Sequence, residues 1–136
     1  MTVTTTAPVT RRVDRSRVRY AVVGAGNIGQ VAVLPAFEHA RENSELAALV
    51  CDDAEKCAAP ARRYDVPALP CAELESAIVR EAIDAVYIAL PSALRRAHVE
   101  RAARAGAHVL CEKPMATSSR DCDAMIDACD RAAVRL

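Results

Sequence analysis

The chain is poor in aromatic residues and in glycine, with no Trp, a single Phe and 4 Gly among its 136 residues. With so few aromatics it lacks the stacking surfaces on which proteins bind the bases of single-stranded nucleic acid. It also lacks an excess of either charge, because 18 Lys and Arg residues balance 18 Asp and Glu residues. A balanced chain presents no electrostatic footprint for nucleic acid or an anionic membrane. We therefore expect neither as a partner.

Long apolar runs are absent as well. No stretch approaches the roughly 18 unbroken apolar residues of a membrane span, and residues 1–17 contain no apolar core of a secretory signal. These 17 residues show no apolar periodicity, so we expect a poorly ordered tail, with folded structure starting near Val18. Residues 18–136 are long enough for one domain with a real core.

Cysteine is present, but not in the spacings that mark a metal site. No two of the six cysteines have C-x-x-C spacing, so there is no such pair with a histidine at zinc-finger distance. No metal site is therefore predicted. Cys51 and Cys111 fall inside apolar runs, where a free cysteine behaves as a small hydrophobic residue. A chain that is 52% hydrophobic does not need a disulfide framework. We expect reduced thiols in a cytoplasmic protein.

Three of the 4 glycines stand together, in a G-x-G-x-x-G segment. Residues 20–23 before it are apolar and partly β-branched, as in a buried parallel strand, and residues 30–41 have helical character. In a dinucleotide-binding turn the first glycine allows a tight turn, the second lets the backbone approach a pyrophosphate and the third allows close packing. The alternative is a purely structural turn. We predict that a dinucleotide binds here through Gly24, Gly26, Asn27, Ile28 and Gly29.

An acidic residue follows the second apolar run, at residues 45–51. Asp52 comes after Gly29 at about the 20-residue distance at which a Rossmann unit places the acid that binds the adenosine ribose. We predict this role for Asp52, and NAD rather than NADP as the cofactor, because a carboxylate repels a 2′-phosphate. The alternative is that Asp52 or Asp53 caps the next helix. The two interpretations are compatible if Asp52 binds the ribose and Asp53 caps the helix.

Strand and helix patterns alternate along the rest of the chain. The expected strands are 66–69, 85–90 and 107–111, and the expected helices are 54–64, 72–79, 93–105 and 120–132. Pro35 should kink or interrupt the first helix. This alternation predicts an α/β fold with a doubly wound parallel sheet between two helix layers, the Rossmann fold. Ligands of such sheets bind at the carboxyl ends of the strands.

With these features in place, residues 18–136 resemble the N-terminal domain of the Gfo/Idh/MocA family, the glucose–fructose oxidoreductases and inositol dehydrogenases. The resemblance implies an NAD(P)-dependent oxidoreductase that transfers hydride between nicotinamide and a sugar, cyclitol or related alcohol or carbonyl. It rests on Val-Gly-Ala-Gly-Asn-Ile-Gly at 23–29, Leu-Val-Cys-Asp at 49–52, Asp-Ala-Val-Tyr-Ile-Ala-Leu-Pro at 84–91, Gly-Ala-His-Val-Leu at 106–110 and, most specifically, Cys-Glu-Lys-Pro at 111–114.

The resemblance assigns the catalytic role to Lys113. Its ammonium would lie near the nicotinamide and stabilise negative charge on the reacting oxygen, and the Lys113–Pro114 bond would be cis. By its residue type alone, Lys113 would be a solvated lysine at a strand end. Further cofactor contacts are implied for Pro91, Ser92, Glu112 and Lys113.

The chain departs from the family pattern on the nicotinamide side. The family often has Thr-Pro-Asn where Leu90-Pro91-Ser92 stands, and a histidine where Arg95 stands. His98 and His108 match histidines of the family, and we expect both to be structural.

Length is the larger departure. The family continues into an α+β domain that supplies substrate contacts and proton-transfer residues, and we expect that domain to be absent here. The chain alone should then not turn over a small-molecule substrate, and its uncovered sheet edge should favour self-association into a homo-oligomer. The alternative function is a non-catalytic dinucleotide-binding or interaction module. A methyltransferase-like domain is disfavoured by the G-x-G-x-x-G spacing.

Overall fold

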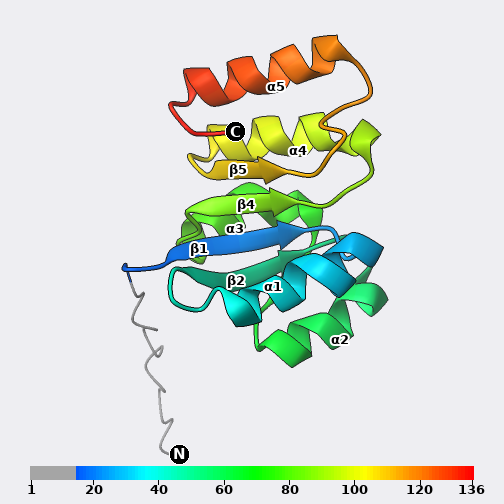
Figure 1. Cartoon of the computed structure of the whole chain (residues 1–136), viewed down its shortest axis with the longest axis vertical. Helices are drawn as coiled ribbons and strands as arrows, with labels where there is room; N and C mark the ends of the chain where they lie inside the picture. The colour runs from blue at the N-terminus through cyan, green and yellow to red at the C-terminus, as the bar shows by residue number, and fades with distance from the viewer. Residues whose placement is uncertain (1–14) are drawn as a thin grey trace, which may run out of the picture.

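A computed structural model describes residues 15–136, so most of the predicted tail lies outside the described residues. Its centre is a five-stranded sheet with the order β3-β2-β1-β4-β5, in which every strand pair is parallel (Figure 1). The predicted α/β fold is confirmed. The strands are β1 (Val18–Val23), β2 (Ser44–Val50), β3 (Ala68–Leu69), β4 (Ala85–Ile88) and β5 (His108–Cys111).

Helices cover both faces of the sheet. The predicted helix at 54–64 matches the observed bounds of α2, and the other helices begin and end within a few residues of their predicted positions. The helical elements are η1 (Gly29–Val33), α1 (Leu34–His39), α2 (Ala54–Tyr64), η2 (Cys71–Glu73), α3 (Leu74–Arg80), α4 (Ser92–Arg104) and α5 (Ser119–Arg131).

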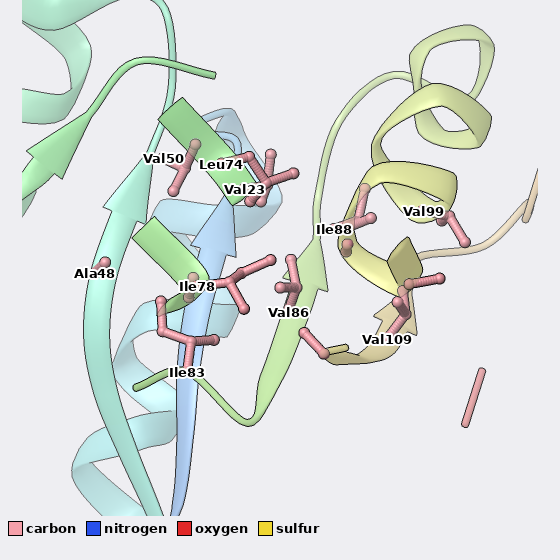
Figure 2. Close-up of a cluster of buried hydrophobic side chains, with 14 of the residues drawn as sticks. Val23, Ala48, Val50, Leu74, Ile78, Ile83, Val86, Ile88, Val99 and Val109 are labelled. Carbon is pink, nitrogen blue, oxygen red and sulfur yellow. The ribbon is translucent and has the colours of Figure 1, made fainter. Parts of the chain in front are cut away.

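Two apolar clusters lie on opposite faces of the sheet, because successive strand residues point to opposite sides. Val22 of β1 packs in one cluster with Leu34 of α1 and with Cys57 of α2. Val23 packs in the larger cluster with residues of α3, α4 and α5, among them Leu74 and Val99 (Figure 2). Both valines are 0% exposed, as expected for a strand buried on both faces.

The first helix changes type beside its proline. It starts with the π-helical turn η1, in which the Leu34 N–H donates to the Gly29 carbonyl, and it continues as α1. Pro35 has no N–H to donate to the preceding turn, so a regular α-helical bond cannot form there. The prediction that Pro35 interrupts this helix is confirmed.

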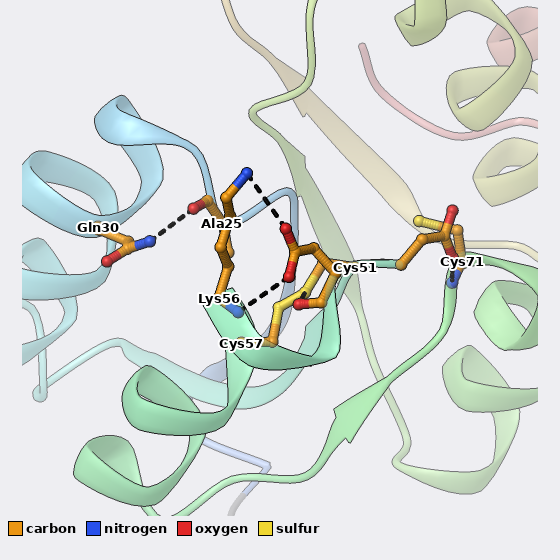
Figure 3. The surroundings of a disulfide bond; sticks show 8 residues. Ala25, Gln30, Cys51, Lys56, Cys57 and Cys71 are labelled. Atoms are coloured by element: carbon orange, nitrogen blue, oxygen red, sulfur yellow. Dashed lines mark hydrogen bonds and ion pairs between the residues drawn. A yellow bond between two sulfur atoms is a disulfide. The ribbon is translucent and has the colours of Figure 1, made fainter.

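The expectation that every cysteine is a reduced thiol is wrong for one pair. Cys51, directly after β2, and Cys57 of α2 form a disulfide, with their Cα atoms 6.7 Å apart (Figure 3). The argument from hydrophobic content missed the pair, because its two members come together through the turn from β2 into α2. The free cysteines are Cys71, Cys111, Cys122 and Cys129.

Candidate functional site

The glycine turn follows β1 at the carboxyl edge of the sheet. Gly24 has a φ of +104°, and a Cβ there would lie 2.8 Å from the Ala89 carbonyl oxygen. A Cβ on Gly29 would lie 2.7 Å from the Gly24 carbonyl oxygen. Around Gly26, by contrast, no atom other than those of its chain neighbours lies within 4 Å of the Cβ position. Gly24 and Gly29 are therefore required by the turn itself, whereas Gly26 borders open space that a ligand can enter.

The turn runs directly into the first helix. The Gln30 N–H donates to the Gly26 carbonyl at 3.1 Å, and the Gln30 side-chain amide donates to the Ala25 carbonyl at 2.6 Å (Figure 3). Asn27 and Ile28 of the first turn are exposed beside the open space. The bracing role of Gln30 was missed from sequence, because a lone glutamine after the motif carries no signal of its own.

The two acidic residues after β2 divide the roles that the sequence left open. Asp53 caps α2, since its carboxylate accepts from the Lys56 N–H at 3.1 Å and lies 3.1 Å from the Lys56 ammonium. The bond from the Lys56 N–H holds the pKa of Asp53 below its usual value. Asp52 is exposed, and its Oδ1 accepts from the Cys71 N–H at 2.8 Å. Asp52 therefore does not cap the helix, and its carboxylate is anchored at the sheet edge.

A second set of side chains lies at the ends of β4 and β5. Glu112 accepts from the Tyr87 hydroxyl at 2.6 Å and, at 3.1 Å, from the Lys113 N–H. The Tyr87 bond lowers the pKa of Glu112, while burial and this carboxylate raise the pKa of Tyr87 to about 12. Glu112 is therefore ionised and Tyr87 neutral near pH 7. The Lys113–Pro114 bond is cis and the Lys113 side chain is exposed.

Arg95 is the side chain that joins these two strand ends. It is 7% exposed, and its Nε donates to the Leu90 carbonyl at 2.7 Å. Its Nη1 donates to the carbonyls of Glu112 and Pro114. The sequence singled out Arg95 only as a departure from the family pattern, and nothing in its position predicted that it is buried.

The remaining predicted residues fall into two groups. Pro91 is exposed in the loop after β4, and Ser92 starts α4. His98 lies 2.9 Å from the Leu94 carbonyl, and His108 accepts from the Arg135 N–H at 3.0 Å. Both histidines face backbone groups, in keeping with a structural role.

Backbone hydrogen bonds align the predicted residues along one edge. Gly24 donates to Val50 of β2, Ala89 donates to Val23 of β1, and Glu112 donates to Ile88 of β4. The glycine turn, Asp52, Pro91, Ser92 and the Glu112–Lys113 turn therefore all lie at the carboxyl edge. Such an edge can hold an elongated ligand with phosphates at the turn, hydroxyls at the carboxylate and a reacting group near the lysine.

Two kinds of feature are absent from residues 15–136. None of the helices there is both long enough and apolar enough to cross a bilayer. The same residues include no cluster of three His, Cys, Asp or Glu side chains that could hold a metal ion.

Residues 18–136 match the family model described as the oxidoreductase family with an NAD-binding Rossmann fold. Among curated relatives, the chain is 34% identical to the D-xylose 1-dehydrogenase (NADP(+)) 2 of Haloferax volcanii, over 86% of this chain and 35% of the relative. The chain therefore spans about a third of the length of such relatives.

Solved structures give the same result. The aldose-aldose oxidoreductase of Caulobacter crescentus, complexed with glycerol, superimposes with a TM-score of 0.83 and 39% identity, over 88% of this chain and 36% of that one. The WlbA dehydrogenase of Bordetella pertussis, in complex with NADH and UDP-GlcNAcA, gives a TM-score of 0.81 and 31% identity over the same shares. The chain belongs to the Gfo/Idh/MocA oxidoreductase family, and it forms the NAD-binding Rossmann domain of that family.

Proposed function

We propose that this chain binds NAD(H) along the carboxyl edge of its sheet. The observation that carries the proposal is the open space at Gly26, flanked by two glycines that the turn itself requires. Phosphates would lie against Gly26, Asn27 and Ile28, where backbone N–H groups of the first helical turn are unpaired. The adenosine ribose would lie at Asp52 and the nicotinamide beside Lys113.

The nicotinamide would supply hydride transfer when bound. The part of this chain is then to orient the reacting oxygen, and the exposed ammonium of Lys113 is the group that can do so by stabilising negative charge on that oxygen. Glu112 does not compete for that oxygen, because its carboxylate is held by Tyr87 and by the Lys113 N–H. Pro91 and Ser92 would border the ring from the β4 side.

The charges at the end of β2 favour NAD over NADP. Asp52 and Asp53 place two carboxylates where a 2′-phosphate would lie, and the Lys56 ammonium is already paired with Asp53. Relatives with either cofactor are known, since the Haloferax protein is named for NADP and the WlbA structure holds NADH. The preference for NAD rests on these carboxylates.

We further propose that the complete protein is an oxidoreductase acting on a sugar, cyclitol or related alcohol. Positioning a substrate against the nicotinamide needs walls on both sides of the cleft, and residues 15–136 supply one wall. The 136-residue chain with NAD should therefore give no turnover on a panel of sugars and cyclitols. Robust turnover by this chain would contradict the assignment of the substrate wall to a second domain.

Calorimetric titration tests the binding proposal. The unmodified chain should bind NADH, and Gly26→Val should abolish binding because the new side chain fills the space that the phosphates need. Circular dichroism should show the fold of the variant unchanged, because nothing lies near the new side chain. The matched control is Ala97→Val at an exposed position of α4, which should bind normally. Unchanged NADH affinity in Gly26→Val would contradict the phosphate site.

A further inference from the structure

We propose that Arg95 is a positioning residue for the nicotinamide half of the site, and that it acts by fixing the main chain on both sides of Lys113. This inference rests on the proposed function, since it concerns the same site. It goes further by assigning a role to a buried charge that the family resemblance marked only as a departure.

The contacts of Arg95 bracket the lysine. Its guanidinium donates to the carbonyl of Glu112, one residue before Lys113, and to that of Pro114, one residue after it. The Lys113 backbone is therefore held on both sides, while its side chain stays exposed. A third bond, to Leu90, fixes the loop after β4 to the same guanidinium.

Burial makes these bonds obligatory. Arg95 is 7% exposed, and a buried guanidinium is costly unless its N–H groups are paired. Its three hydrogen-bond partners are all backbone carbonyls, so it does not pair with a carboxylate as a surface arginine would. A carbonyl is part of the main chain, so the bonds fix the loop itself rather than a flexible side chain.

The shape of the side chain matters as much as its charge. Arginine presents five N–H donors in a rigid planar fork, which can serve carbonyls from two loops at once. Lysine keeps the charge on a flexible stem and lacks the fork, and a histidine ring carries at most two N–H donors on a shorter side chain. Neither residue can reproduce the three bonds with the same geometry.

The effect should be confined to one half of the ligand. Strands β4 and β5 lie on one side of β1, whereas Asp52 follows β2 on the other side. In the proposed site, ADP would reach only the glycine turn and Asp52, whereas NADH would also reach the loops after β4 and β5. If Arg95 positions the nicotinamide half, its loss should weaken NADH binding and leave ADP binding unchanged. If Arg95 only stabilises the fold, its loss should weaken the binding of both ligands.

The experiment compares the affinities of NADH and ADP by calorimetry, in the unmodified chain and in Arg95→Met and Arg95→Lys. We expect Arg95→Met to weaken NADH binding by about 10-fold, and ADP binding by less than about 2-fold, because three backbone carbonyls lose their donor. The NADH affinity of Arg95→Lys should fall between those of the unmodified chain and of Arg95→Met. The matched control is Arg96→Met at the next position, whose side chain pairs with Glu100 and Asp121 on the surface and should change neither affinity.

A second readout keeps the test decisive if Arg95→Met does not fold. In amide NMR spectra, Arg95→Lys should shift or broaden the Lys113 resonance while Gly24, Gly26 and Gly29 stay in place. Equal weakening of NADH and ADP, or an unmoved Lys113 amide, would overturn the inference and leave the dinucleotide site standing. If the unmodified chain binds neither ligand, the proposed function fails, and this inference fails with it.

Discussion

The two halves of the carboxyl edge are built in different ways. The glycine turn is local: its residues lie within six positions, and its shape follows from the φ of Gly24 and from the contacts of Gly29. The Lys113 half is assembled from separate elements, since Tyr87 of β4 and Arg95 of α4 hold Glu112 and its neighbours after β5. The proposed phosphate half of the site can therefore be encoded in one motif, whereas the Lys113 half depends on tertiary contacts.

The surroundings of the two halves differ as well. Around the glycine-turn half, Val22 and Leu49 are completely buried. An apolar pocket of about 290 Å³ lies between the first helix and strands β4 and β5, and its lining includes Phe37, Tyr87 and Glu112. Leu110 also lines this cavity and is 51% exposed. The Lys113 half is therefore bordered by apolar surface that the described residues leave open.

The largest effect on folding should come from Gly24→Ala. A Cβ there meets the Ala89 carbonyl at 2.8 Å and occupies a residue with φ of +104°, so we expect a loss of about 3 kcal/mol in urea unfolding. Gly106→Ala is the matched control, because Gly106 has a φ of +85° but no atom near its Cβ position. It should lose only about 1 kcal/mol, the cost of the backbone conformation. Equal losses of unfolding free energy in the two variants would mean that the close contact with the Ala89 carbonyl adds no cost at Gly24.

In the complete protein, Lys113→Ala should lower kcat by about 100-fold while leaving the dissociation constant of NAD within about 2-fold. The reason is that, in the proposed role, the ammonium would act on the reacting oxygen rather than on the cofactor phosphates. Steady-state kinetics and NADH titration measure the two quantities. Lys56→Ala, which removes an exposed lysine from the other half, should leave kcat unchanged. A matching loss of NAD affinity in Lys113→Ala would assign Lys113 to cofactor binding instead.

The choice between NADH and NADPH should depend on the acidic pair after β2. The double variant Asp52→Ser, Asp53→Arg removes two negative charges and adds a positive one, so we expect the NADH preference to narrow by about 10-fold. Titration of both cofactors into both proteins measures the change. Tighter binding of NADPH than of NADH by the unmodified chain would refute the assignment of NAD. Arg62 or Arg63 of α2 would then be the residue to test as the phosphate ligand.

The smallest effect concerns acid stability beside Asp52. Arg101 lowers the pKa of Glu75 to about 2 through paired hydrogen bonds, and it also donates to the carbonyl of Cys71, whose N–H holds Asp52. A lowered folded-state pKa gives stability that is present above the usual pKa of about 4.3 and is lost as pH falls towards 2. Because the Glu75 side chain is 41% exposed, we expect less than about 1 kcal/mol.

Urea midpoints at pH 6 and pH 3 test this effect. The unmodified chain should lose more stability between the two values than Glu75→Gln, which has no carboxylate to protonate. The control is Glu73→Gln, which removes an exposed carboxylate 3.4 Å from Arg80. This variant should lose as much stability between pH 6 and pH 3 as the unmodified chain does. An identical pH response in Glu75→Gln would exclude a contribution from this ion pair.

Features that depend on neighbouring residues can be predicted from the sequence. The alternation of strands and helices, the interruption at Pro35, the cap at Asp53 and the glycine turn all follow from local backbone chemistry. For this reason the fold class and the bounds of α2 were predictable. The position of Lys113 at a strand end was also predictable, but its role came from resemblance to a family and not from its residue type.

Contacts between groups that are distant in the sequence depend instead on how the sheet and helices pack. Asp52 bonds to Cys71, and Tyr87 bonds to Glu112. Arg95 bonds to the carbonyls of Glu112 and Pro114, which lie 17 and 19 residues after it. No local pattern encodes these pairs, since hydrogen bonds and burial depend on where the packed sheet and helices place each side chain.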